Sequence, residues 1–398
     1  MSSRIIYVIL TLLAFLLIFF PKNTQSIQEK VEAQGFLKLG ESQERTISPG
    51  MIHVWNLSLE AGQYAVVEVQ QKSIDVVVRI VNPAGELKRE FNSPLVIWGT
   101  EKATWIAYAT GTWKVEIMPS ENARPGGYEI KFMVQGKATD RDQQLVEADS
   151  LNRLVEAYIS QGNFSAAEPL CRRSLDIRKK LLEPEHLDVA WSLNNLGLIY
   201  QIQDKYVEAD SLHKRSLSIR EKVLGPEHPY VAVSLSNLGW LYSKQGKYTE
   251  AESFYKRSLT IREKTLGLDH PDVARSLEGL SSLYVDQGKY AEAEPLYKRS
   301  LEIWKKALGA EHIEVTGCLD GLGSLYWKQG KYDESEQFYQ QSLKIKKKTF
   351  GENHLSVALN LNELANIYNS RGSYEQAEPL YRQALEIYKK VLGPEHSN

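Results

Sequence analysis

In the C-terminal part of the chain, apolar and polar residues alternate with a helical period, and the whole pattern repeats. Leu193, Leu196 and Tyr200 are spaced i, i+3, i+7, which places them on one face of a helix. After a short turn, a second apolar face that includes Ala209 and Leu217 predicts a second helix. The aromatic residue that opens the second helix recurs every 42 residues, as Phe164, Tyr206, Tyr248, Tyr290, Tyr332 and Tyr374. Residues 147–398 therefore hold six two-helix units.

Two columns of side chains predict how these helices pack. A tyrosine of each first helix is large and partly polar, so it fills the gap between helices while its hydroxyl stays in water. The facing residue of each second helix is small, which lets the two helices approach closely. One unit cannot bury its own apolar faces, so stacked units form a continuous core. The columns are Tyr158, Tyr200, Tyr242, Tyr284, Tyr326 and Tyr368, and Ala167, Ala209, Ala251, Ala293, Ser335 and Ala377.

The turns of each unit carry their own signals. Glycine stands between the two helices in most copies, and Asp204 is the exception. The second helix ends at a Leu-Gly pair such as Leu224-Gly225, where glycine can adopt the left-handed conformation that stops a helix. A histidine follows in each loop, and hydrogen bonds that fix the loop explain it better than a metal site, because neighbouring loops lie too far apart to share an ion. These histidines are His186, His228, His270, His312, His354 and His396.

Residues 35–136 show a period of two instead. Alternating apolar residues occur at Trp55, Leu57 and Leu59, and again at Tyr128, Ile130, Phe132 and Val134. Turn sequences such as 60–62 and 82–85 separate the runs. Seven or eight short strands of this kind predict an antiparallel β-sandwich. Polar residues 23–34 and residues 137–146 are interpreted as linkers on either side of it.

The N-terminus carries an uncharged apolar run at residues 5–20, after a short basic stretch. The run is 16 residues long, which at about 1.5 Å per residue is shorter than a hydrocarbon core of about 30 Å. Residues 1–22 therefore have two interpretations, a cleaved signal peptide or an uncleaved membrane anchor. Both place the rest of the chain outside the cytoplasm, and the second adds the membrane as a partner through residues 5–20.

Composition, charge and the absence of known motifs in the sequence limit the kinds of function that the chain can be expected to have. The net charge of −2 gives no indication of nucleic-acid binding, and paired Lys and Arg residues on the second helices are balanced by Glu. The two cysteines, Cys171 and Cys318, lie three repeats apart in ordinary helix positions, which excludes a disulfide framework. No phosphate-binding glycine loop, HExxH, nucleophile elbow or CxxC occurs. We expect no catalytic residues, no metal site and no cofactor.

The repeat resembles the tetratricopeptide repeat (TPR), through Leu196, Gly197, Tyr200, Ala209 and Leu217 and their equivalents. The usual repeat is about 34 residues long, and the longer loop at 224–229 is similar to the kinesin-light-chain type. This likeness covers roughly the last 250 residues and implies a superhelical solenoid, a scaffold that by itself names no biochemical task.

The β region resembles the pre-peptidase C-terminal type of jelly-roll sandwich, through the sequences at 59–64, 73–78, 82–85, 111–113 and 126–130. The combination is similar to exported bacterial TPR proteins, in which a caspase-like protease domain (CHAT) frequently follows. Here the sequence stops at Asn398, without that domain. The apolar residues Leu385, Ile387, Val391 and Leu392 are then expected to form an uncovered stripe on which a second chain docks.

The likeness to TPR arrays implies that the inner face of the first helices binds extended peptides. Asparagine suits such a groove because its amide both donates to and accepts from a peptide backbone, and tryptophan supplies apolar anchors. The alternative is that these residues merely face solvent on a spacer. The predicted groove residues are Asn152, Asn194, Gln201, Ser236, Trp240, Glu278, Asp320, Trp327, Asn362 and Asn366.

Taken together, the sequence predicts a non-enzymatic adaptor outside a bacterial cytoplasm that binds partner proteins in the TPR groove. The alternative is a regulatory or sensor subunit of a caspase-like protease system, or a truncated relative of one. A third class, an autonomous hydrolase, would need a catalytic constellation that the sequence lacks.

Overall fold

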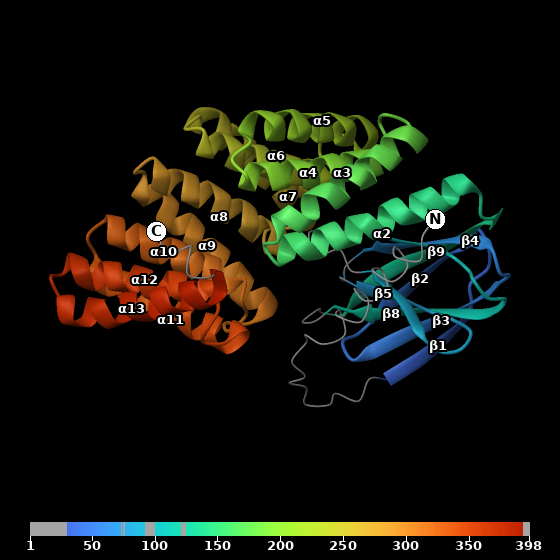
Figure 1. Cartoon of the computed structure of the whole chain (residues 1–398), viewed down its shortest axis with the longest axis horizontal. Coiled ribbons are helices and arrows are strands. Elements are labelled where there is room, and N and C mark those ends of the chain that lie inside the picture. The colour runs from blue at the N-terminus through green and yellow to red at the C-terminus, as the bar shows by residue number, and fades with distance from the viewer. Residues whose placement is uncertain (1–29, 73, 75, 92–99, 121–124, 393–398) are drawn as a thin grey trace.

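A computed structural model describes residues 30–392, apart from residues 73, 75, 92–99 and 121–124. Two β-sheets are followed by twelve helices that stack as a solenoid, so the predicted fold class is confirmed (Figure 1). The apolar run at residues 5–20 lies outside this part of the chain. Among the helices that are described, none combines the length and apolar character needed to cross a membrane.

The β region consists of nine strands in two sheets, one more strand than the upper expectation. The five-stranded sheet has the order β1-β3-β8-β5-β6 and the four-stranded sheet the order β2-β9-β4-β7. All pairings are antiparallel except that of β1 with β3, which is parallel. The bounds are β1 Lys30–Phe36, β2 Ser42–Ile47, β3 Met51–Leu59, β4 Gln63–Gln71, β5 Val76–Val81, β6 Leu87–Phe91, β7 Thr100–Ile106, β8 Gly111–Pro119 and β9 Gly126–Lys137.

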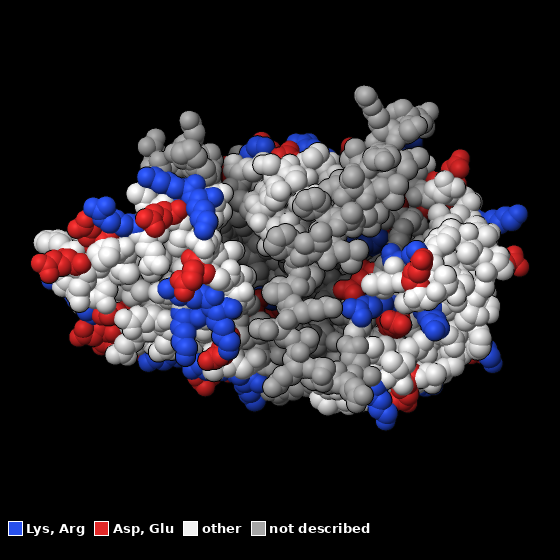
Figure 2. Space-filling model, turned by 60° about the horizontal axis from the view of Figure 1, so that its bottom comes forward, with Lys and Arg blue, Asp and Glu red and all other residues white. Residues whose placement is uncertain are grey.

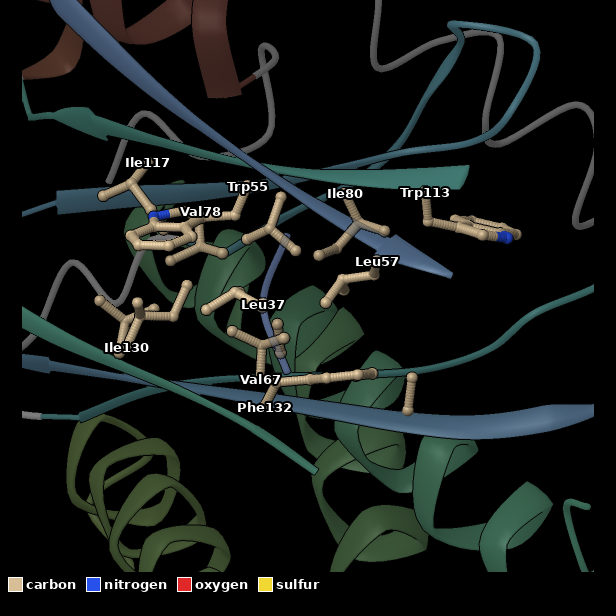
Figure 3. Packing of buried hydrophobic residues seen from close by; sticks show 14 of the residues in the cluster. Leu37, Trp55, Leu57, Val67, Val78, Ile80, Trp113, Ile117, Ile130 and Phe132 are labelled. Atoms are coloured by element: carbon tan, nitrogen blue, oxygen red, sulfur yellow. The ribbon is translucent and has the colours of Figure 1, made fainter. Parts of the chain in front are cut away.

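The core of the β region lies between the two sheets, and the alternation read from the sequence places it there. Trp55 and Leu57 of β3 point inward together with Trp113 of β8. Ile130 and Phe132 of β9 face them from the other sheet (Figure 3). Because successive side chains of a strand point to opposite faces, the residues between them lie on the outer faces.

Both predicted linkers are shorter in the structure than the sequence suggested. Strand β1 begins at Lys30 and pairs with β3, so residues 30–34 of the first predicted linker belong to a strand. Residues 23–29 lie outside the described residues. The second linker, 137–146, is wrong: β9 ends at Lys137 and the first helix begins at Asp140. Thr139 and Asp142 form a capping box, in which each side chain accepts from the other's backbone N–H, and this starts the helix early.

The twelve helices alternate between first and second helices of six repeats. Successive first helices contact one another from α2 to α10, whereas successive second helices contact one another less. The first helices therefore lie on the inner side of the curve that Figure 1 shows between α2 and α13. The bounds are α2 Asp140–Ser160, α3 Phe164–Leu181, α4 Leu187–Ile202, α5 Tyr206–Leu224, α6 Pro229–Lys244, α7 Tyr248–Leu266, α8 Pro271–Asp286, α9 Tyr290–Leu308, α10 Val315–Lys328, α11 Tyr332–Phe350, α12 Leu355–Ser370 and α13 Tyr374–Leu392.

The turn chemistry predicted from the repeats is confirmed in part. Gly225 ends α5 with φ 89° and ψ 157°, a conformation with positive φ that lies outside the left-handed helical region that was predicted. Asp204 adopts φ 58° where the other copies have glycine. The loop histidines fix the loops: His186, His228 and His270 each accept a hydrogen bond at Nδ1 from the backbone N–H two residues on, at 3.1 Å. This contact caps the next first helix. His396 lies outside the described residues.

Helices α7, α9 and α11, the second helices of the third, fourth and fifth repeats, each place an aromatic ring against a glycine of a first helix. A Cβ built on Gly239 of α6 would come within 3.0 Å of the Tyr255 ring, and one on Gly279 of α8 within 2.5 Å of the same ring. Tyr255 therefore bridges the third and fourth repeats through two backbones that carry no side chain at the contact. Tyr297 lies against Gly321 and Tyr339 against Gly323 in the same way, with built Cβ distances of 2.4 and 2.8 Å.

The tyrosine column of the first helices behaves differently from the expectation that its hydroxyls face water. Tyr284 donates to Glu252 at 3.0 Å and Tyr326 to Glu294 at 2.8 Å. Each acceptor lies on the second helix of the preceding repeat, so these hydroxyls tie neighbouring repeats together. The facing alanines, such as Ala209 and Ala251, are fully buried, as predicted.

Helix α2 joins the β region to the array. Val146 of α2 packs on Tyr64 and Val66 of β4, and so covers the outer face of the four-stranded sheet. Thr104 of β7 donates to Asp149 of α2 at 2.6 Å. The first repeat is thus part of two cores at once.

The expected apolar stripe on α13 is only partly exposed. Leu385 and Val391 keep 40% and 47% of their surface exposed, whereas Ile387 is buried against Val357 and Leu361 of α12. The prediction was wrong for Ile387 because this residue faces the helix partner within its own repeat. Docking of a second chain on α13 stays a prediction.

The glycine contacts generate a stability prediction. Gly321→Ala places a methyl group 2.4 Å from the Tyr297 ring, and we expect it to lower the free energy of unfolding by about 1–3 kcal/mol. This loss outweighs the gain in helix propensity of about 1 kcal/mol. Gly317→Ala on the same helix is the matched control, because its Cβ meets only the side-chain end of Glu278. The urea concentration at the midpoint of unfolding is compared for the two variants. Equal midpoints would contradict the conclusion that the Tyr297 ring needs a glycine at position 321.

A second prediction concerns pH. His213 occupies the position of Tyr255 one repeat earlier, and burial lowers its pKa from 6.5 to about 4. Below pH 6.5 the unfolded chain binds a proton that the folded chain does not, so His213 makes stability fall as the pH falls from 6.5 to 4. The loss is on the order of 3 kcal/mol. His213→Tyr should flatten the dependence of the unfolding free energy on pH across this window, and an unchanged slope in urea titrations would refute the assignment.

Candidate functional site

The inner face of the first helices is the candidate site, and the structure divides the predicted groove residues into two sets. Three of them are buried, and the remaining seven keep part of their surface exposed. Trp327 is the most accessible large side chain of the second set, with 40% of its surface exposed. The buried set is Asn152, Asn194 and Gln201, and the accessible set is Ser236, Trp240, Glu278, Asp320, Trp327, Asn362 and Asn366.

The buried amides make contacts inside the array. Asn194 accepts a hydrogen bond from Asn237 at 2.9 Å, which links the second and third repeats. Gln201 lies 3.1 Å from His213, and Asn152 donates to Glu156 at 3.1 Å. These contacts correct the sequence interpretation: Asn194 and Gln201 link neighbouring helices, Asn152 binds a residue of its own helix, and the three side chains are buried.

The accessible residues have partial contacts. Trp327 donates to Ser370 at 3.4 Å, one repeat further along. Trp240 lies under the ammonium group of Lys244, 5.3 Å from its ring centroid. Asn366 accepts from the Tyr381 hydroxyl at 2.6 Å. Each of these side chains keeps part of its surface exposed.

A column of long second-helix side chains reaches the inner face from behind. In the third, fourth and fifth repeats, the second-helix residue that lies 26 positions after a groove residue forms a hydrogen bond with it. Arg262 donates to Ser236 at 3.3 Å, and Lys346 donates to Asp320 at 2.6 Å. The column consists of Arg178, Arg220, Arg262, Trp304, Lys346 and Tyr388. Sequence reasoning missed this column, because the basic pairs that it considered, such as Lys214-Arg215, occupy other positions of the same helices.

The same column also binds the next repeat. Arg178, Arg220 and Arg262 donate to Ser192, Ser234 and Ser276, each 14 residues further along, at 2.7–2.9 Å. Each of the three also donates to a backbone carbonyl at the start of the next first helix. The sequence does carry a signal for these contacts: an arginine recurs every 42 residues, and a serine follows each one 14 residues later.

The buried cations differ in how their charge is compensated. Arg178 pairs with Asp149 at 2.7 Å. Burial alone would raise the pKa of Asp149, but the Arg178 charge and the hydrogen bond from Thr104 leave that pKa below its usual value. Arg220 has no carboxylate partner among the described residues and lies 5.8 Å from the Trp191 and Tyr230 ring centroids. Burial lowers the pKa of Arg220 to about 10.

The two cysteines are buried inside the array. Cys171 and Cys318 are both fully buried, and burial raises the pKa of each thiol, that of Cys171 to about 12. Groups of three or more His, Cys, Asp or Glu arranged for a metal ion do not occur in the part of the chain that the structure describes. On the face that Figure 2 shows, acidic and basic side chains are interspersed over both the repeats and the β region.

Comparisons with known proteins agree with the fold. No curated protein matches the chain. Among solved structures, BtubC (BKLC) from P. vanneervenii is 19% identical, with 66% of this chain and 95% of that chain covered and a TM-score of 0.46. A putative kinesin light chain with nearly identical TPR-like repeats from Podosopora anserina is 28% identical, with coverage of 52% and 98% and a TM-score of 0.43. Aspartyl phosphate phosphatase F from Bacillus subtilis is 16% identical, with coverage of 64% and 62% and a TM-score of 0.49.

The family profile of the tetratricopeptide repeat matches five overlapping segments, 146–222, 193–264, 241–306, 272–348 and 315–390. Together these segments run from residue 146 to residue 390, which is more than half of the chain and coincides with the helical array. The chain belongs to the tetratricopeptide repeat family.

Proposed function

We propose that this protein is a non-enzymatic scaffold that holds an extended segment of a partner protein along the inner face of its TPR array. The observation that carries the proposal is the display of Trp240 and Trp327 on that face, two repeats apart, with part of each indole exposed. Partly exposed tryptophans are the side chains that most often dominate binding energy at protein interfaces. TPR proteins are typically scaffolds of this kind.

The polar residues around the indoles suit a peptide backbone. Asn362 and Asn366 are separated by one helical turn on α12, and both keep part of their surface exposed. An amide offers a donor and an acceptor, so it can hydrogen-bond a backbone in place of water. A curved array of rigid helices presents such groups in fixed positions, which lowers the entropic cost of binding an extended chain.

Replacement of the two anchors tests the proposal. We expect Trp240→Ala combined with Trp327→Ala to weaken the binding of a pool of random fluorescein-labelled nonapeptides by at least about tenfold, measured by fluorescence anisotropy. Tyr374→Ala is the matched control, because Tyr374 is 68% exposed at the start of a second helix, outside the inner face. Unchanged affinity in the double variant would place binding elsewhere, and no binding by the wild type would exclude the groove function.

We further propose that the chain acts outside the cytoplasm of a bacterium, with residues 1–22 as a signal peptide or membrane anchor. The uncharged run at residues 5–20 and the likeness of the β region to pre-peptidase sandwiches support this proposal. The two-sheet arrangement of the β region agrees with that likeness.

Expression of the tagged chain in a bacterial host tests the location. The full chain should appear in the cell envelope, accessible to protease added to spheroplasts, because an apolar run after a basic start directs export. A variant without residues 1–22 should stay in the cytoplasm. The same fractionation for both forms would contradict the proposal.

A further inference from the structure

The fourth repeat breaks the pairing between the groove residues and the column behind them. In the fifth repeat the acidic groove residue Asp320 meets Lys346 at 2.6 Å, so its charge is compensated. In the fourth repeat the acidic groove residue Glu278 meets Trp304, which occupies the place of the cation. An indole donates one hydrogen bond but carries no charge. Glu278 is therefore an acidic groove residue without the basic partner of its neighbour.

The two oxygens of this carboxylate are in different situations. Oε1 accepts from Trp304 Nε1, from Ser300 Oγ at 3.2 Å and from Cys318 Sγ at 3.2 Å. Oε2 has no hydrogen-bond or ion-pair partner among the described residues, and it is not sealed from solvent. Burial raises the pKa of the Glu278 carboxyl group, although the three donors to Oε1 oppose this rise.

Oε2 lies close to a backbone position that carries no side chain. A Cβ built on Gly317 of α10 would lie 2.8 Å from Oε2, and Gly317 itself is exposed. The equivalent positions of the other repeats all carry a side chain, namely Asp149, Trp191, Val233, Arg275 and Leu359. At this repeat boundary, a carboxylate oxygen without a hydrogen-bond partner therefore lies beside an exposed glycine.

The nearby cations of the chain are engaged elsewhere. Arg275 of α8 pairs with Asp272 at 3.1 Å and lies over the Trp304 ring, 5.5 Å from its centroid. Lys346 is held by Asp320. The other charged group that acts on Glu278 is Glu314, which is also acidic. An external cation would therefore find a carboxylate that no cation of the described chain pairs with, and one of its oxygens has no hydrogen-bond partner.

We propose that Glu278 and Gly317 form a subsite that receives the ammonium group of a lysine side chain of the bound segment; this subsite rests on the proposed groove function. A buried carboxylate that gains a hydrogen-bonded cation regains part of the electrostatic energy lost on desolvation. Lysine fits better than arginine because Oε1 is already saturated, and a guanidinium binds best when both carboxylate oxygens are free for its two parallel hydrogen bonds.

Binding of defined peptide pools to the full chain tests the subsite. The probes are fluorescein-labelled nonapeptides that are random except for a central Lys, Arg, Gln or Glu, and the readout is fluorescence anisotropy. We expect the Lys pool to bind on the order of tenfold more tightly than the Gln pool, with Arg between them and Glu weakest. Glu278→Gln should abolish the difference between the Lys and Gln pools. Glu334→Gln is the matched control, because Glu334 is an exposed acid at the start of α11, and it should leave the difference unchanged.

A second variant separates the subsite from a loss of folding. Gly317→Leu introduces the residue that the last repeat carries at the equivalent position, Leu359, which is 54% exposed there. It should remove the preference for lysine while the Gln pool binds as before and the far-ultraviolet circular dichroism melt stays cooperative. A lysine preference that is absent in the wild type, or that survives in both variants, overturns the subsite but leaves the groove function intact. No binding of any pool overturns the groove function and the subsite with it.

Discussion

The array depends on the contact between an aromatic ring of one helix and the bare backbone of two others. The Tyr255 ring lies between Gly239 and Gly279, which belong to successive repeats, so one side chain sets the distance both within a repeat and between repeats. Because the ring is flat and the glycines carry no Cβ, the three helices approach more closely than any side chain would allow. The variation along the array follows from this constraint. Where the second helix has the small Cys171, the first helix has Val155 in place of glycine, and both are buried.

The polar contacts of the array follow the same geometry. Once the helices are this close, a long second-helix side chain passes between two first helices and reaches their inner side. Arg178 and Arg262 do so, and each satisfies a serine and a backbone carbonyl of the next repeat. A buried cation costs several kcal/mol unless it is paired or hydrogen-bonded. Both helices of a repeat therefore contribute to this region, and its charge depends on second-helix residues such as Lys346 as well as on first-helix acids such as Asp320.

This two-sided construction explains what the sequence could predict and what it could not. The period of 42 residues, the helical faces and the glycine stops are local properties, so the solenoid and its repeat boundaries followed from the chain alone. The groove residues were placed correctly on the first helices by the same register. Their availability depends on contacts with the second helix and the next repeat: Asn194 and Gln201 are buried by such contacts, whereas Trp327 is not. The early start of α2 was missed although its capping box, formed by Thr139 and Asp142, is a local signal of a helix start.

The junction between the two parts of the chain limits how the groove can move relative to the β region. A flexible linker would let the array rotate freely, but α2 packs its Val146 on the outer face of a sheet and continues without a break into the first repeat. The hydrogen-bonded chain from Thr104 through Asp149 to Arg178 extends this contact into the column behind the groove. The four-stranded sheet is therefore connected to the first repeat by apolar packing and by a hydrogen bond to the carboxylate that pairs with Arg178. Because a buried cation costs several kcal/mol unless it is paired, a sheet residue that holds Asp149 in place also stabilises Arg178 inside the array.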